Sequence, residues 1–433
     1  MAIKVAVIGG GVAGLCAARY LCAKSPDVFQ AVVYEQSDQI GGTWVYTDTV
    51  GKDNYGQPVH SSMYRRLRTN LPKELMMYPG LPIMEGGKTS FIKHEEVLQY
   101  LNRYAATYDL HKCIQLRTRV EFVKPIVSCH KTTWEVTVRN VEDPDATPQV
   151  LEFDAVMVCN GQFAVPNYPV IPGLETFKGK VIHSHEYRHP EDFKGQSVVV
   201  LGGGLSGCDI SVDLHSYVNK IYLSHHNSNL TRTVLPSNLK QVPDVALIEE
   251  GRFVFADGQR VEADSLILST GYLYDFPFLA PECEVVVDRK RISPLYKHVL
   301  HTKFTSLSFM GMVWSICPFH VISSQVRFAM AVLDGTVTLP STADMNSDSQ
   351  RDYEYRRNEL KFPHHYAHKL GPMQFHYNKE LLQMAKVDED DDAVKPIFEE
   401  LYHKTHDLRL EDMANYKTHI FELSDDLKSW EMK

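Results

Sequence analysis

The chain has 433 residues, of which 44% are apolar and 23% charged, enough for two or three globular domains. Its formal net charge of −9 argues against nucleic acid or an anionic membrane as a partner. Its apolar runs are shorter than the roughly 18 residues that cross a bilayer, which predicts a soluble protein without a membrane anchor. The first residues lead directly into a strand pattern, so we expect a cytoplasmic protein, or a secreted one whose signal peptide has been removed.

The first predicted unit is a buried strand over residues 3–8, a glycine-rich turn, a helix over residues 15–21 and a strand over residues 31–34. The glycines allow a tight turn and let the backbone approach a pyrophosphate at the helix N-terminus. Glu35 ends the second strand, 21 residues after the last glycine, where a carboxylate accepts hydrogen bonds from an unphosphorylated ribose, as in FAD or NAD. The candidate residues of the turn are Gly9, Gly10, Gly11, Val12, Ala13 and Gly14.

The same unit recurs with a strand over residues 197–201, a second glycine-rich turn, a helix over residues 208–218 and a strand over residues 221–223. The residues that follow, Ser-His-His-Asn, lack an acid, which is compatible with the 2′-phosphate of NADP. Arg232 could supply positive charge for that phosphate, although a polar surface loop explains the same residues nearly as well. The candidate residues of this turn are Gly202, Gly203, Gly204, Leu205, Ser206 and Gly207.

A shorter repeat closes each unit, because residues 153–161 and 263–271 both read as an acid, an apolar strand and a glycine. We expect the second copy to meet a bound nucleotide at Thr270 and Gly271, although two buried strands that end in turns would look similar. Linkers rich in proline or glycine at residues 166–173 and 276–278 indicate domain crossings.

The elements therefore predict an α/β fold with two doubly wound, Rossmann-like dinucleotide-binding domains, the NADP domain being inserted into a discontinuous FAD domain. The expected domains are residues 1–167 for the first part of the FAD domain, 168–278 for the NADP domain, and 279–433 for the second part of the FAD domain with a C-terminal helical region.

A flavin site beside a nicotinamide site predicts hydride transfer from NAD(P)H to FAD. Cys16 and Cys22 are six residues apart on the predicted helix and do not face each other, which disfavours a disulfide reductase and leaves O2 as the natural acceptor. The eight cysteines lack the close spacing of a zinc or dithiol site, so we expect buried small apolar side chains. Adjacent histidine pairs do not face one site either, and we expect no metal.

Residues 177–187 read Phe-Lys-Gly-Lys-Val-Ile-His-Ser-His-Glu-Tyr and resemble the Phe-x-Gly-x-x-x-His-x-x-x-Tyr fingerprint of flavin-containing monooxygenases. The similar Baeyer–Villiger monooxygenases carry Trp where this chain has Tyr187. The resemblance covers about residues 1–330 and includes Gly-Gly-Thr-Trp at 41–44, the segment 63–74 and Ser-Thr-Gly-Tyr at 269–272. Within the family, the chain is most similar to the soluble insect enzymes of the senecionine (pyrrolizidine alkaloid) N-oxygenase type.

The resemblance implies that NADPH reduces FAD and that a C4a-hydroperoxyflavin then oxygenates nitrogen or sulfur of a small lipophilic amine, sulfide or alkaloid. It assigns Asn70 to the active site, where its amide would orient the hydroperoxide and the nicotinamide. We expect His183 and Tyr187 to brace the linker and position NADP rather than to transfer protons. The further cofactor-binding residues that it implies are Gly42, Thr43, Trp44, Thr69, Asn70 and Leu71.

Members of the family commonly have Arg where this chain has His226 and Asn227, so we predict that NADH is used at a measurable rate beside NADPH. Two alternatives stay open. One is a Baeyer–Villiger monooxygenase, and the other is a non-oxygenating NAD(P)H–flavin protein that delivers electrons to a protein partner. A homo-oligomer is compatible with the sequence.

Overall fold

Two β-sheets, one mixed and one parallel, carry the fold of the computed structural model, which describes residues 2–82, 89–129, 131–143, 145–226, 230, 233–387 and 394–433. The first sheet has seven strands in the order β20-β21-β22-β7-β1-β2-β3, in which β2, β1, β7 and β22 run parallel. Its strands are β1 (Ile3–Ile8), β2 (Phe29–Tyr34), β3 (Ile114–Gln115), β7 (Ala155–Val158), β20 (Leu295–Tyr296), β21 (Leu300–His301) and β22 (Leu307–Phe309).

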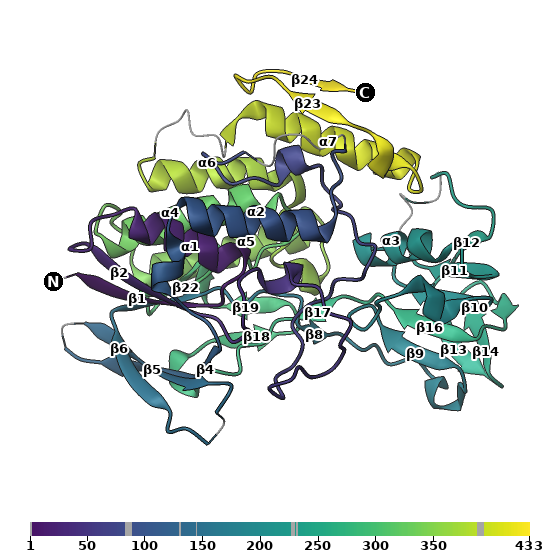
Figure 1. The fold of residues 1–433 in the computed structure, drawn as a ribbon, viewed down its shortest axis with the longest axis horizontal. Helices are drawn as coiled ribbons and strands as arrows, with labels where there is room; N and C mark the ends of the chain where they lie inside the picture. The colour runs from purple at the N-terminus through teal and green to yellow at the C-terminus, as the bar shows by residue number, and fades with distance from the viewer. Residues whose placement is uncertain are drawn as a thin grey trace.

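The second sheet has five parallel strands in the order β12-β11-β10-β16-β9. Its strands lie in the chain between β7 and β20 of the first sheet, so the second unit is inserted into the first, and Figure 1 shows the two side by side. They are β9 (Lys180–His183), β10 (Ser197–Leu201), β11 (Lys220–Ser224), β12 (Leu239–Val242) and β16 (Ser265–Leu268).

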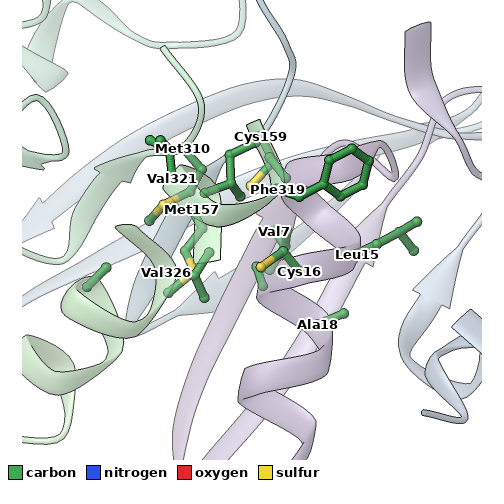
Figure 2. Close-up of a cluster of buried hydrophobic side chains, with 14 of the residues drawn as sticks. Val7, Leu15, Cys16, Ala18, Met157, Cys159, Met310, Phe319, Val321 and Val326 are labelled. Carbon is green, nitrogen blue, oxygen red and sulfur yellow. The ribbon is translucent and has the colours of Figure 1, made fainter. Parts of the chain in front are cut away.

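Helices cover the first sheet, and α1 packs against α4, which packs in turn against α6. Figure 2 shows the core beneath them, where Val7 of β1 and Met157 of β7 meet Cys16 of α1 and Phe319 of α4. Each such buried apolar side chain contributes about 1.5–3 kcal/mol, so this core holds the carboxyl ends of β1 and β7 in place. The helices are α1 (Val12–Cys22), α2 (His94–Thr107), α3 (Leu205–Leu214), α4 (Pro318–Leu333), α5 (Thr342–Asn358), α6 (Gln374–Met384) and α7 (Pro396–Glu411).

Small antiparallel sheets complete each unit. The sheet β4-β5-β6 packs with apolar residues of the first sheet, and β13-β14-β15 packs with those of the second. The pair β8-β17 joins the two chain crossings between the units. These strands are β4 (Thr118–Val127), β5 (Thr132–Asn140), β6 (Gln149–Phe153), β8 (Val165–Pro166), β13 (Val245–Glu249), β14 (Arg252–Phe255), β15 (Arg260–Val261), β17 (Tyr272–Leu273), β18 (Val286–Asp288), β19 (Arg291–Ser293), β23 (Phe421–Leu423) and β24 (Trp430–Met432).

The structure corrects two predicted helix boundaries. Helix α1 begins at Val12 rather than residue 15, and α3 begins at Leu205 and ends at Leu214 rather than spanning 208–218. In both cases the last glycine of the motif, Gly14 or Gly207, lies inside the first helical turn, and the glycine before it, Gly11 or Gly204, is the N-cap. Within the described part of the chain, no helix is long and apolar enough to cross a bilayer.

The prediction of buried cysteines holds for five of the eight: Cys16, Cys159, Cys208, Cys283 and Cys317. Cys22 and Cys113 are half-buried, and Cys129 is exposed.

Candidate nucleotide-binding and active site

The first glycine-rich turn lies at the carboxyl end of β1 and leaves no room for a side chain at Gly9 or Gly14. The Gly9 N–H donates to the Tyr34 carbonyl (2.8 Å), and a Cβ on Gly9 would lie 2.5 Å from the Cys159 oxygen. A Cβ on Gly14 would lie 1.8 Å from the Gly9 oxygen, so α1 contacts the end of the strand through bare backbone. Gly11 is the N-cap of α1 and has no side chain to cap it, which leaves the first-turn N–H groups for a ligand. That first turn contains the predicted residues Val12, Ala13 and Gly14.

Glu35 lies against this turn and is 8% exposed. Its Oε2 atom accepts the Gly10 N–H (2.7 Å), and its Oε1 atom accepts the Ser37 N–H and hydroxyl (2.8 and 2.9 Å). Each carboxylate oxygen accepts two hydrogen bonds, so Oε2 has one further acceptor position for a ribose hydroxyl.

The predicted segment Gly42–Trp44 forms a short 3₁₀ helix, η1, beside the first turn. A Cβ on Gly42 would lie 3.0 Å from the Cα of Gly11, so the two glycines meet backbone to backbone. The Thr43 carbonyl accepts the Ser61 hydroxyl (3.0 Å), and Trp44 packs against the core around α1. These contacts bring together residues that the sequence placed in separate motifs.

The second glycine-rich turn repeats this geometry at the end of β10. The Gly202 N–H donates to the Ser224 carbonyl (2.9 Å), and a Cβ on Gly202 would lie 2.3 Å from the Ser269 oxygen. A Cβ on Gly207 would lie 1.8 Å from the Gly202 oxygen, the same distance as in the first turn. The N-cap of α3, Gly204, has no described atom within 4 Å of an added Cβ. This face of the turn is open, and Leu205 and Ser206 are exposed.

His225 takes the place after β11 that Glu35 takes after β2. A Cβ on Gly203 would lie 2.8 Å from the His225 Cβ, and the His225 Nε2 lies 2.8 Å from the Gln241 Oε1. Burial lowers the pKa of His225, so its ring is neutral at neutral pH. The next residue, His226, lies 3.1 Å from the Asp244 Oδ2, an acid beside this site that the sequence pattern did not reveal.

Thr270 and Gly271 contact the crossing between the two units. The Thr270 hydroxyl donates to the Asn167 carbonyl (2.5 Å), and the His183 Nε2 lies 3.1 Å from the Gly271 oxygen. A Cβ on Gly271 would lie 2.9 Å from the Lys290 Nζ. Burial lowers the pKa of His183 to about 4, so the ring is neutral, in keeping with a bracing role. The role of Thr270 and Gly271 as nucleotide contacts stays a prediction.

Asn70 is half-buried and lies in a segment that is fixed on both sides. The Thr69 N–H donates to the Ile92 carbonyl (2.8 Å), and Leu71 packs against two hydrophobic cores. The Asn70 Oδ1 accepts the Tyr416 hydroxyl at 3.3 Å. Tyr416 is 346 residues away in the chain, and no pattern in the sequence connects the two.

Arg188 is a further residue that sequence reasoning missed. The residue is 4% exposed, and its guanidinium donates to the carbonyls of Thr47 (2.7 Å), His185 (2.7 Å) and Ser61 (3.3 Å). It therefore ties the monooxygenase fingerprint to the segment that follows η1. The one signal in the sequence is that Arg188 directly follows Tyr187 of that fingerprint.

Tyr187 itself is fully buried and its hydroxyl donates to the Asp213 carboxylate on α3 (2.7 Å). Its ring meets the Tyr64 ring edge to face, with centroids 5.3 Å apart. These contacts agree with a brace between α3 and the segment before Asn70.

The two turns fit the nucleotides that the sequence implies. Both have glycine where a Cβ would block the backbone and an N-cap without a side chain. The first adds a carboxylate with a spare acceptor position for a ribose, and the second adds a neutral histidine at the equivalent place. A 2′-phosphate would be repelled by the Glu35 carboxylate at the first turn but not by the neutral His225 imidazole at the second. The two sites therefore differ in the nucleotide that they would accept.

Arg232, which the sequence predicts near the 2′-phosphate, and Asn227, which stands where the family commonly has Arg, lie outside the described residues. The acidic run at 388–392, for which the sequence predicts a solvated loop, lies outside them as well. Among the described residues, no group of three or more His, Cys, Asp or Glu side chains is arranged to hold a metal ion.

The chain is similar in sequence to known flavoproteins. The family described as Flavin-binding monooxygenase-like matches residues 2–231 and 225–391. The Flavin-containing monooxygenase FMO GS-OX4 of Arabidopsis thaliana is 37% identical over 390 residues, which cover 86% of this chain and 82% of the plant protein. The Flavin-containing monooxygenase FMO GS-OX-like 4 of the same plant is 35% identical over 412 residues, or 91% of this chain and 90% of that protein.

Solved structures resemble the whole chain. S-allyl-L-cysteine S-oxygenase from Allium sativum has a TM-score of 0.87 at 32% identity, over 98% of this chain and 96% of that one. Tmm from Pelagibacter sp. strain HTCC7211 has a TM-score of 0.85 at 26% identity, over 99% and 95%. Cyclohexanone monooxygenase, at 14% identity and a TM-score of 0.61 over 89% and 98%, shares the fold. These likenesses confirm the predicted α/β fold with two Rossmann-like units.

Proposed function

The chain belongs to the flavin-binding monooxygenase-like family, and on that premise we propose that it adds one oxygen atom from O2 to sulfur or tertiary nitrogen of a small molecule. FAD and NADPH are the cofactors of this family. The observation that carries the proposal is the pair of equivalent glycine-rich turns, one with Glu35 and the other with His225 at the same place.

The first turn would hold FAD. Its backbone and the N-terminus of α1 would bind the pyrophosphate, Glu35 would accept from the ribose, and Gly42–Trp44 would border the same nucleotide. The second turn and α3 would hold NADPH in the same manner, with His225 near the ribose. The chemistry supplied by the two cofactors is hydride transfer from NADPH to FAD and activation of O2 at the reduced flavin.

Asn70 would be the polar side chain that orients the reacting groups. Its Oδ1 accepts from the Tyr416 hydroxyl, so its Nδ2 group would donate to an oxygen of the cofactors. Packing of Thr69 and Leu71 limits the freedom of this segment, which reduces the reorganisation needed when substrate enters. Oxygen transfer to a soft nucleophile requires no protein nucleophile, so positioning and the exclusion of water are what this chain would contribute.

The sulfur substrate class has the better support. The Allium neighbour with 32% identity is named an S-allyl-L-cysteine S-oxygenase, whereas the nitrogen class rests on the resemblance to alkaloid N-oxygenases. Pyrrolizidine alkaloids such as senecionine stay a prediction. The Baeyer–Villiger alternative has fold-level likeness alone, and Tyr187 stands where those enzymes carry Trp.

The test is a substrate comparison with the FAD-loaded full chain, NADPH and ¹⁸O₂. S-allyl-L-cysteine, a tertiary amine, senecionine and cyclohexanone would be assayed separately, with mass spectrometry of the products and peroxide measured beside NADPH consumption. We expect one labelled oxygen in a sulfoxide or N-oxide for each NADPH consumed. A lactone from cyclohexanone would favour the Baeyer–Villiger alternative, and peroxide equal to NADPH with every compound would contradict oxygenation.

A further inference from the structure

The segment from Glu411, the last residue of α7, to Phe421, the first of β23, connects the two nucleotide-binding units; we call residues 411–421 the C-terminal strap. At its first end, the Glu411 carbonyl accepts the Val234 N–H (3.1 Å), and Met413 packs into the core of the second unit. At its other end, the Phe421 N–H donates to the Ser90 hydroxyl (2.7 Å) in the first unit. Figure 1 shows α7 leading toward α3 and the chain returning to β23.

The middle of the strap reaches the candidate active site. Tyr416 is 3% exposed, its ring meets Phe91 edge to face at 5.3 Å, and its hydroxyl donates to the Asn70 Oδ1. The contact determines which end of the Asn70 amide faces the strap and which faces away.

The next residue, Lys417, makes a charged bridge between the two units. Its ammonium donates to the Arg68 carbonyl (3.0 Å), two residues before Asn70, and pairs with the Asp209 carboxylate on α3 (2.5 Å). The Lys417 and Asp209 side chains are 13% and 17% exposed, and the Tyr64 hydroxyl donates to the second oxygen of Asp209.

Because Lys417 and Asp209 are largely buried, their charged groups must keep their hydrogen-bond and ion-pair partners. An ammonium that has lost most of its water requires each remaining partner, and burial lowers the pKa of Lys417 although Asp209 opposes that shift. Removal of one partner of a buried pair leaves the other charge uncompensated, so the segment around Arg68 and helix α3 are constrained together.

We propose that Lys417 is a positioning residue, which fixes Asn70 relative to helix α3 and thereby sets how the flavin side and the nicotinamide side of the site meet. The proposal rests on the proposed function, because it assumes that Asn70 and the turn before α3 contact the same bound FAD and NADPH. Tyr416 acts together with Lys417: Lys417 holds the segment that carries Asn70, and Tyr416 orients the Asn70 amide.

The experiment compares Lys417→Met, Lys417→Arg, Asp209→Asn and the double variant Lys417→Met/Asp209→Asn in the full chain loaded with FAD. Lys428→Met is the matched control, because Lys428 lies in the same C-terminal region with its side chain 82% exposed. Three readouts are measured: hydrogen exchange of residues 65–72 and of α3, the Kd for NADP⁺ in the absence of turnover, and peroxide formed per NADPH consumed.

We expect Lys417→Met to speed exchange in both segments, to raise the Kd for NADP⁺ on the order of tenfold, and to raise the peroxide fraction, because small misplacement of reacting groups is costly. Lys417→Arg and the double variant should recover part of each effect, and Lys428→Met should match the wild type. Unchanged exchange at residues 65–72 in Lys417→Met, or a double variant worse than the sum of the singles, would overturn the proposal.

Two further variants, Tyr416→Phe and Asn70→Ala, test the proposal even if Lys417→Met does not fold. Tyr416→Phe removes one hydroxyl and keeps the buried ring, so it should fold even if Lys417→Met does not, and it should raise the peroxide fraction with little change in the Kd for NADP⁺. An unchanged peroxide fraction in Tyr416→Phe would contradict the proposed role of Tyr416 in orienting the Asn70 amide. Asn70→Ala separates the two proposals: if it leaves peroxide unchanged, the role of Asn70 fails, while faster exchange in Lys417→Met would still establish the bridge.

Discussion

Glu35 and His225 occupy equivalent positions in the two halves of the molecule. A Cβ on Gly10 would lie 3.0 Å from the Glu35 Cβ, and a Cβ on Gly203 would lie 2.8 Å from the His225 Cβ. Each residue follows the second strand of its unit and packs against the second glycine of its turn. Because one is a carboxylate and the other a neutral imidazole, we expect this single difference in side chain to change which ribose each site accepts.

Replacement of Glu35 tests the first site. Glu35→Ala removes the acceptor for the ribose and leaves the N–H groups of Gly10 and Ser37 without this partner. A hydrogen bond to a charged group is worth about 1.5–3 kcal/mol, so we expect the Kd for FAD to rise on the order of tenfold to a hundredfold. Titration of the apoprotein followed by flavin fluorescence measures it. Glu282→Ala, at an exposed carboxyl, is the control, and an unchanged Kd in Glu35→Ala would assign the ribose to another residue.

Replacement of His225 tests the second site. His225→Asp places a negative charge where a 2′-phosphate would bind, and like charges at about 4 Å cost on the order of 1–4 kcal/mol near a protein surface. We expect kcat/KM with NADPH to fall at least about tenfold relative to kcat/KM with NADH, and the wild type to show measurable NADH activity. Steady-state rates with both nucleotides decide this. Equal losses for the two would place the phosphate elsewhere.

Gly204 and Gly207, two of the four glycines in the second turn, predict opposite outcomes when replaced by alanine. Gly207→Ala would put a Cβ 1.8 Å from the Gly202 oxygen, which requires backbone movement and costs about 3 kcal/mol or more. Gly204→Ala meets no described atom within 4 Å, so its stability should stay near that of the wild type while NADPH affinity falls. Thermal unfolding and the Kd for NADP⁺ test both. A stable Gly207→Ala variant would contradict the close contact of α3 with the end of β10.

Glu74 makes stability depend on pH near neutrality. It is buried, it accepts the Ser90 hydroxyl at 3.1 Å, and burial raises its pKa to about 7. Between the ordinary pKa and about 7 the folded state binds more protons than the unfolded state, so stability falls as pH rises through this window and stays lower above it. Glu74→Gln should remove this dependence and stabilise the protein above neutral pH by at most about 3 kcal/mol.

Unfolding midpoints of Glu74→Gln and the wild type, measured on either side of pH 7, test this expectation. Glu282→Gln, at an exposed carboxyl, should show the pH dependence of the wild type. A parallel pH dependence in Glu74→Gln and the wild type would show that Glu74 is ionised throughout.

Cys22 and Cys113 are poised for oxidation. Their sulfur atoms lie 3.5 Å apart, and Cys113, as a hydrogen-bond partner, lowers the pKa of Cys22 to about 7. Hydrogen peroxide should convert the two thiols to a disulfide with release of two waters, since the thiolate is the reactive form. Peptide mapping without reduction would show the cross-link, and Cys22→Ser should abolish it while Cys129→Ser should not. Oxidised Cys22 without a bond to Cys113 would contradict the prediction.

The sequence by itself determined both nucleotide-binding units. The repeated order of acid, apolar strand and glycine corresponds to repeated hydrogen bonds: the Lys4 N–H donates to Asp154 (2.9 Å), and the Ser197 N–H donates to Asp264 (2.8 Å). Such units are readable because backbone dihedrals, side-chain periodicity and glycine spacing are local properties of the chain. The sequence pattern predicts both helix starts three residues late, because a glycine in the first helical turn is also typical of a loop.

Only the tertiary structure decided what surrounds Asn70. Tyr416 and Lys417 are 346 and 349 residues from their partners Asn70 and Arg68, and the Cys22–Cys113 contact spans 91 residues. These contacts depend on how α7, the strap and α3 pack in space, and no local pattern encodes that packing. The physical reason is that dihedral preferences act between neighbours in the chain, whereas burial of a charge or a ring brings together whichever residues the completed fold makes adjacent.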